Sequence, residues 1–124
     1  MRTALASSAA IMMSVGAAFA AAEGVELPSG LSGYLQEVVE DEGGDLFRFR
    51  FVAEAFSKDA GLEVVTADLE HLCAEIAVSE VPEGARIVVS LADQPSEFGV
   101  ASPGVAQVFE AFRAENGRCI WEEF

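Results

Sequence analysis

Two runs of alternating apolar and polar residues flank the strongest turn signal of the chain, over residues 109–124. Asn116-Gly117 interrupts the alternation, and this dipeptide favours a two-residue type I′ turn, which needs positive φ at both positions. The turn predicts a hairpin in which directly opposed residues share a face. One face then carries Phe112, Ala114, Cys119 and Trp121. The other face carries Phe109, Ala111, Arg113, Ile120, Glu122 and Phe124.

Three further segments are predicted to be strands: residues 34–41, 46–56 and 86–92. The second is the clearest, because Phe47, Phe49 and Phe51 alternate with Arg48 and Arg50, which is typical of a strand buried on one face only. Together with the hairpin arms, these segments predict about five strands.

The two arginines on this strand allow two interpretations. In so acidic a chain, Arg48 and Arg50 are expected to pair with carboxylates on neighbouring strands. The alternative is a recognition patch for an anionic group.

A helical period follows Thr66, which is a good N-cap residue, with Asp68 and Glu70 in the expected first turn. Residues 62–65 are ambiguous. The inward stripe of this helix, with spacing i, i+3, i+4 and i+7, contains Leu69, Leu72, Cys73 and Ile76.

These elements predict an α+β fold, with a mainly antiparallel sheet of about five strands and one helix packed on one face. The helical period and the strand period place Cys73 and Cys119 in the same layer, so we expect a disulfide between them. A strand, helix, strand order over residues 46–92 also favours a crossover that lays the helix on the sheet.

The N-terminal segment has the pattern of a secretory signal peptide. Arg2 precedes an uncharged apolar run, and cleavage is expected after Ala20 or after Ala22. The alternative is a membrane anchor, for which the run is short and rich in alanine, since a span needs roughly 20 strongly apolar residues. We therefore predict a signal peptide over residues 1–22, a single domain over 23–124, and a periplasmic or secreted protein without a membrane association after cleavage.

The net charge of the chain limits the classes of partner that it can attract. The formal net charge is −14, and loss of Arg2 with the leader makes it −15. Such a field repels nucleic acid and anionic lipid. Solubility explains the acidic composition well, and attraction to a basic partner or to Ca²⁺ is the alternative.

Candidate chemistry is sparse. No catalytic residue and no cofactor is predicted, because no known catalytic or phosphate-binding motif is visible. His71, the only histidine, has Asp68 and Glu75 within reach on the helix surface, so a divalent metal site or a small hydrolase centred on these three residues is the alternative function.

Two surfaces are candidates for binding. The first is the long loop over residues 93–104, where Phe98 stands beside Asp93 and Glu97; its aromatic ring either folds back onto the core, as we favour, or forms part of a binding site. The second is the hairpin face opposite the helix. Its apolar members are Phe109, Ile120 and Phe124, which a protein partner, a second copy of the chain or the segment 25–33 would cover.

Four segments carry a resemblance to a known family. In chain order they are F-R-F-R-F-V-A, D-L-E-H-L-C, I-V-V-S-L-A-D-Q-P-S-E-F-G and F-E-A-F-R-A-E-N-G-R-C-I-W-E-E-F. The chain resembles a family of small exported proteins of marine alphaproteobacteria, known only as a domain of unknown function. The resemblance begins near residue 27 and implies no activity and no site residues.

Some members of that family carry the label acetolactate synthase. This label cannot describe the present chain, because a thiamine-diphosphate enzyme is several-fold longer and needs cofactor motifs that are absent here. The sequence thus favours an exported, non-catalytic binding or accessory module.

Overall fold

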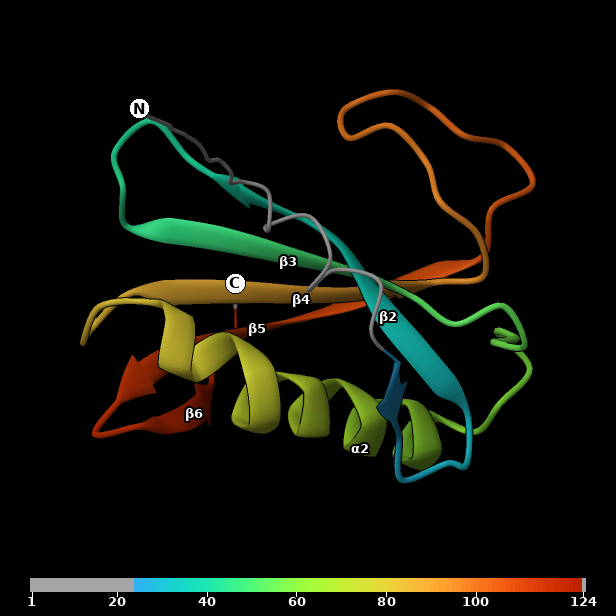
Figure 1. Ribbon diagram of the computed structural model, residues 1–124, viewed down its shortest axis with the longest axis horizontal. Helices are drawn as coiled ribbons and strands as arrows, with labels where there is room; N and C mark the ends of the chain where they lie inside the picture. Colours follow the sequence, from blue (N-terminus) through green and yellow to red (C-terminus); the bar gives the residue numbers. More distant parts are fainter. Residues whose placement is uncertain (1–23, 124) are drawn as a thin grey trace, which may run out of the picture.

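A computed structural model describes residues 24–123, as a curled sheet with one helix on one of its faces (Figure 1). The predicted leader and Phe124 lie outside the described residues. The six strands are β1 (Val25–Glu26), β2 (Ser32–Glu40), β3 (Leu46–Val52), β4 (Arg86–Ala92), β5 (Gln107–Glu115) and β6 (Arg118–Trp121). They lie in the sheet in the same order as in the chain.

The sheet is mixed. Neighbouring strands are antiparallel except for β3 and β4, which run parallel because the helix α2 (Leu62–Leu72) connects them. The α+β class is confirmed in broad terms, whereas the expectation of about five, mainly antiparallel strands needs correction. The additional strand, β1, pairs only two residues with β2, and so short a strand shows no period in the sequence.

The helix begins one turn earlier than the sequence analysis expected. Gly61, not Thr66, precedes its first residue, and the amide of Val65 donates to the Gly61 carbonyl. The β-branched run left residues 62–65 ambiguous. Residues 62–65 are helical because Val65 extends the inward stripe of Leu69 and Leu72 and is itself buried against the core.

The C-terminal end of the helix changes its winding. After α2 the chain continues as a π-helical segment, η2 (Cys73–Ala77), and then as a short 3₁₀ turn, η3 (Val78–Glu80). Cys73 begins η2 and forms the expected disulfide with Cys119 of β6, with 2.06 Å between the sulfur atoms and 6.2 Å between the Cα atoms. The helix is therefore covalently linked to the last strand.

The terminal hairpin has the predicted register. Phe112 lies opposite Trp121, and Ala114 lies opposite Cys119. Asn116 and Gly117 have φ values of 55° and 75°, as the type I′ turn requires. The predicted opposition of Phe109 and Phe124 involves a residue outside the described range.

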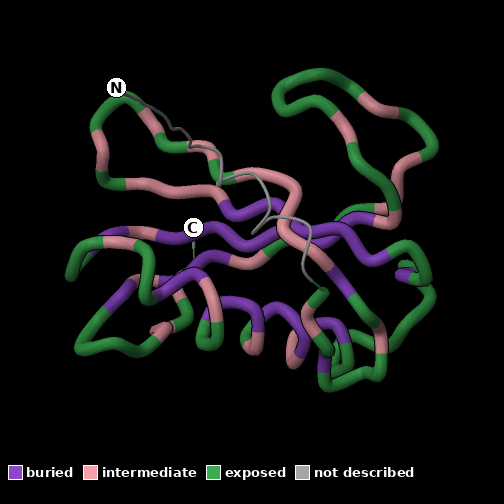
Figure 2. The backbone as a smooth tube through the Cα atoms, in the orientation of Figure 1, coloured by how far each residue is buried: buried purple, intermediate pink, exposed green. Residues whose placement is uncertain are grey.

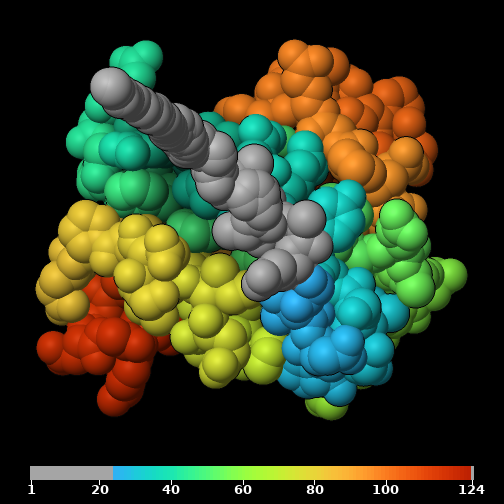
Figure 3. Space-filling model, viewed as in Figure 1, coloured from blue at the N-terminus to red at the C-terminus, as the bar shows by residue number. Residues whose placement is uncertain are grey.

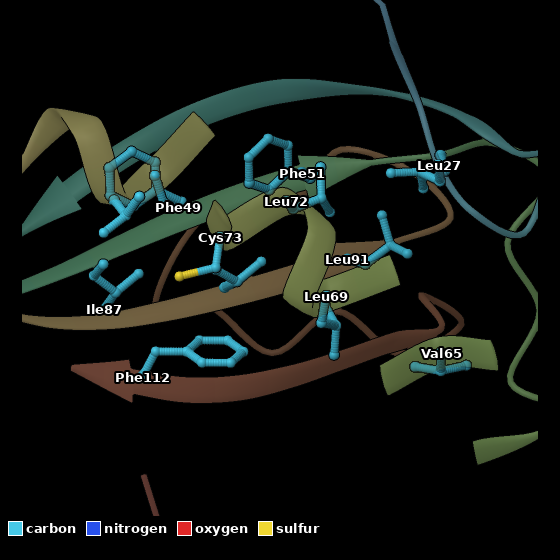
Figure 4. Packing of buried hydrophobic residues seen from close by; sticks show 14 of the residues in the cluster. Leu27, Phe49, Phe51, Val65, Leu69, Leu72, Cys73, Ile87, Leu91 and Phe112 are labelled. Carbon is cyan, nitrogen blue, oxygen red and sulfur yellow. The ribbon is translucent and has the colours of Figure 1, made fainter. Parts of the chain in front are cut away.

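The core fills the space between the helix and the sheet (Figure 4). Phe49, Ile87 and Phe112 project from three neighbouring strands towards Leu69 and Leu72 of the helix, and each of these side chains is at most 2% exposed. Figure 2 shows the same pattern along the backbone, with buried positions on the central strands and on the sheet-facing side of the helix. Because alternate strand residues point to opposite faces, the residues between these core positions point away from the helix.

The segment before β2 lies on the helix side of the sheet. Leu27 joins the core, and Ser29 bonds to the buried Asp68 of α2: the Ser29 amide donates to Oδ1 at 3.0 Å and its hydroxyl donates to Oδ2 at 2.6 Å. The alternative in which residues 25–33 cover the opposite hairpin face is therefore wrong, since Asp68 and the core hold this segment on the helix side.

Candidate functional site

The sheet face opposite the helix, called the far face below, gathers most of the positive charge of the chain. Strand periodicity points alternate residues of each strand there, as the register between the strands requires. The far face includes Glu37, Val39, Arg48, Arg50, Val52, Arg86, Val88, Ser90, Ala92, Gln107, Phe109, Ala111, Arg113, Ile120 and Glu122.

Carboxylates from neighbouring segments pair with these arginines, as the strand alternation predicted. Arg50 forms a close ion pair with Glu37 of β2, and Arg48 Nε lies 3.8 Å from Asp41 Oδ1. At the other end of the face, Glu122 pairs with both Arg86 and Arg113. The acidic chain therefore neutralises much of the charge of this face itself.

The long loop between β4 and β5 lies over the far face. Figure 1 shows it projecting on the side of the sheet opposite the helix, and Figure 3 shows its residues as a lobe beside β2. The Arg50 guanidinium holds the loop at Ser96, donating to its carbonyl at 3.1 Å and its hydroxyl at 3.0 Å, and Gln36 Nε2 donates to the same carbonyl at 2.7 Å. Side chains of two strands thus position the loop.

The base of this loop is closed by Asp93. Its backbone amide donates to the Ala106 carbonyl, and its Oδ1 accepts the amide of Ala106 at 3.1 Å. Asp93 was predicted as a member of a binding surface, but it stands at the junction of loop and sheet. It does not line the cavity described next.

Phe98 does not fold back onto the core. It is 46% exposed, and its ring lies over the guanidinium groups of both Arg48 and Arg50, 5.5 Å from ring centroid to each Cζ. The favoured interpretation of this aromatic residue is therefore wrong. The reason is that two arginines on the far face offer the ring a cation–π contact outside the core.

A cavity of about 410 Å³ lies between the loop and the far face. Arg48, Arg50, Val88 and Ser90 come from β3 and β4, while Gln107 and Phe109 come from β5. The loop supplies Ser96, Glu97, Phe98, Gly99, Val100, Ala101, Ser102 and Val105. Phe109 is 60% exposed and Val100 is 54% exposed, so apolar side chains of the lining are open to solvent.

The cavity brings together some of the residues predicted for a binding surface. Glu97, Phe98 and Phe109 line it, although 11 sequence positions separate the two phenylalanines. Ile120 is on the same face but does not line the cavity, because the hairpin register places it opposite Arg113. Phe124 is outside the described residues.

Arg48 and Arg50 are the lining residues that the sequence analysis treated as structural. The signal for their role was present in the alternation of phenylalanine and arginine along β3, which left the possibility of an anion-recognition patch. What the sequence could not show was that the loop, some 45 residues later, covers these two side chains.

The helix residues proposed as a metal site lie on the other side of the sheet. Asp68 is buried, and Ser29 donates to both of its carboxylate oxygens, while Glu75 is exposed and His71 is half-buried. Over residues 24–123, no group of three or more His, Cys, Asp or Glu side chains is arranged to hold a metal ion. The site stays a prediction from sequence, to be tested by metal titration of the protein and of a His71→Ala variant.

No helix within the described part of the chain is both long and apolar enough to cross a bilayer.

The fold and the cavity define a small, disulfide-linked α+β domain with space for a ligand on the sheet face that the helix leaves open. The chain belongs to the family of unknown function DUF6497, whose family model matches residues 9–124. Comparisons with curated proteins and with solved structures gave no match.

Proposed function

We propose that this protein is an exported, non-catalytic binding module that holds a small ligand in the cavity between the far face and the loop over residues 93–106. The observation that carries the proposal is the cavity itself, which joins Phe98 of the loop to Phe109 of β5. Its volume of about 410 Å³ lies within the range typical of small-molecule sites, ~300–1,000 Å³. Apolar walls with a few polar groups are the usual composition of such sites.

The polar groups of the cavity suit binding better than proton transfer. Arginine keeps its proton at all ordinary pH values, so Arg48 and Arg50 can attract and orient a ligand but cannot act as a general base. Arg50 and Ser96 are in addition bonded to each other. We therefore propose a role in capture or delivery, as an accessory to another activity.

Export rests on the sequence pattern of the N-terminal segment, and the disulfide agrees with it. Disulfides form and persist in oxidising compartments such as the periplasm. A periplasmic or secreted location is therefore the location proposed for this domain.

A neutral fluorescent probe tests whether the cavity binds apolar groups. N-phenyl-1-naphthylamine added to the purified, oxidised protein is expected to bind with increased fluorescence. Phe98→Ala and Phe109→Ala are each expected to weaken the binding at least several-fold, because each removes an aromatic wall.

Leu62→Ala is the matched control. Leu62 is 81% exposed on the helix, so its removal also deletes exposed apolar surface, but on the opposite side of the sheet. Equal binding by wild type and by both cavity variants would contradict the proposed function.

The same exposed residues would serve a protein partner or a second copy of the chain. Sedimentation of the purified protein distinguishes these cases. A concentration-dependent dimer that Phe109→Ala dissociates would favour the pairing of two copies over a small ligand.

A further inference from the structure

We propose that the ligand of the cavity is a small organic acid with one carboxylate and an apolar body, and that Arg48 binds the carboxylate. This inference rests on the proposed function, because it names the ligand class of the same cavity. It depends on what the two arginines do within the structure, on the geometry of Phe98 and on the balance of charge around the cavity.

The two arginines are in different bonding states. Arg50 is 7% exposed, and its guanidinium donates to Glu37 and to Ser96. The side chain of Arg48, by contrast, makes no hydrogen bond within residues 24–123. Its Nε is buried, and Asp41 Oδ1 lies 3.8 Å from it, beyond hydrogen-bond distance. Arg48 therefore lines the cavity with donors that have no hydrogen-bond partner among residues 24–123.

Phe98 lies beside those donors. Arg48 Cζ lies over its ring, 5.5 Å from the ring centroid, which is a cation–π contact. The N–H donors of a guanidinium point outward in its own plane, where they match the two oxygens of a carboxylate. The contact with Phe98 therefore holds the Arg48 guanidinium at the wall of the cavity, where a carboxylate would meet its N–H donors.

Local charge favours one negative charge on the ligand rather than two. Two arginines line the cavity, while Glu37 and Asp41 are paired with them and Glu97 lines the loop side. A phosphomonoester carries about −1.5 to −2 charges at neutral pH and would meet these carboxylates as well. A cationic ligand would be repelled by the guanidinium groups of Arg48 and Arg50, which line the cavity. A single carboxylate can accept the donors of Arg48 with less repulsion from these three carboxylates than a doubly charged group would meet.

The remaining lining accommodates the apolar body. Val88 lies beside Arg48 on β4, and Phe109 lies one row along on β5, opposite Ser90. Val88, Val105 and Phe109 therefore give the cavity apolar lining that an aliphatic or aromatic body can contact while Arg48 binds the carboxylate.

Three probes with the same eight-carbon body test the inference: octanoate, octanamide and octylamine, each kept below its aggregation concentration. Dissociation constants are measured by titrating ¹H–¹⁵N spectra of the purified, oxidised protein and following the amides of Ser90, Phe98 and Phe109. Octanoate is expected to bind about tenfold more tightly than octanamide, because a charged hydrogen bond exceeds a neutral one by about 1 kcal/mol or more. Octylamine is expected to bind most weakly.

Arg48→Gln is expected to reduce octanoate affinity to that of octanamide while leaving the affinity for octanamide unchanged. Phe98→Ala is expected to weaken both. Arg118→Gln is the matched control, since it makes the same change of net charge at the exposed hairpin turn, outside the cavity. It is expected to leave the preference intact.

The outcomes separate this inference from the proposed function. If octanamide or octylamine binds as tightly as octanoate, or if Arg48→Gln keeps the preference, the carboxylate assignment is wrong although the cavity still binds ligands. If none of the three probes shifts the cavity amides, the carboxylate assignment and the proposed function both fail.

Discussion

Arg48 and Arg50 differ by two positions on one strand, yet the structure gives them different tasks. Both point to the far face, and both lie under the ring of Phe98. Arg50 is buried and fastens the loop, whereas Arg48 is more exposed and, besides its contact with Phe98, has a long ion pair with Asp41. Arginine thus has a structural role at position 50, whereas at position 48 it keeps hydrogen-bond donors that no acceptor within residues 24–123 uses.

This contrast predicts unequal effects on stability. Arg50→Gln is expected to lower the free energy of unfolding by about 2–3 kcal/mol, because hydrogen bonds to charged groups contribute ~1.5–3 kcal/mol. Arg48→Gln is expected to lower it by less than about 1 kcal/mol, as for an exposed ion pair. Urea denaturation measures both values.

Amide hydrogen exchange shows which part of the chain loses stability in each variant. Faster exchange of the loop amides in Arg50→Gln, and unchanged exchange in Arg48→Gln, would show that Arg50 holds the loop. Equal stability of the two variants would contradict the assignment.

Asp68 is the second residue whose partner lies far away in sequence. It belongs to the helix but bonds Ser29, 39 positions earlier, and so fixes the chain before β2 to the helix. The sequence suggested a role for Asp68 at the positive end of the helix dipole, which the earlier helix start excludes.

Asp68→Asn is expected to lower the free energy of unfolding by about 1–3 kcal/mol, because the amide group cannot accept both bonds from Ser29. Ser29→Ala removes one bond only and is expected to cost about 1 kcal/mol. Thermal denaturation of the single variants and of the double variant measures the coupling. Additive effects would mean that the two residues do not interact, and the exposed Glu75→Gln is the control with no expected change.

At the scale of elements, local patterns predicted well and distant contacts did not. The hairpin register followed from Asn116-Gly117 because a tight turn fixes the pairing of the strands that flank it. The start of the helix was misplaced because burial of Val65 against the sheet outweighs its weak helix propensity.

The candidate site was predictable only in part, for a related reason. Phe98 and Phe109 were both identified, but nothing in the order of residues indicates that the loop lies over β3. The contact depends on Arg50 and Ser96, which are 46 positions apart. Periodicity reports which face a side chain is on, and it carries no information about which loop covers that face.

The disulfide joins two of these elements, the helical segment η2 and the strand β6. Cys73 and Cys119 are 46 residues apart, and a crosslink closing a loop of this length is expected to stabilise the fold by about 4 kcal/mol on the chain-entropy model. The double variant Cys73→Ser/Cys119→Ser should show this loss in urea denaturation.

Reduction of the wild type provides the control, since it should give a similar loss without any substitution. Two free thiols in the unreduced protein, detected by mass spectrometry after alkylation, would contradict the link.

For the whole molecule, the signal-peptide pattern of the N-terminal segment leads to a prediction about proteolytic processing, and processing in turn changes the net charge. Export should remove the leader, so the intact mass of the exported protein is expected to correspond to a chain beginning at Ala21 or at Glu23. Since the leader contains Arg2, cleavage makes the net charge −15 instead of −14. A mass that includes Met1 and the apolar run would contradict export by this route.

The order of the strands has a consequence for how the molecule assembles. Every strand pairs with the strand that precedes it in the chain, from β1 to β6. A polypeptide that arrives with its N-terminal end first can add each strand to an edge that already exists. The parallel pairing of β3 with β4 joins residues far apart in sequence, such as Leu46 and Arg86, so this step is expected to be the slow one. Cys119 is in the last strand, so the disulfide ties the final strand of this order back to the helix that precedes β4.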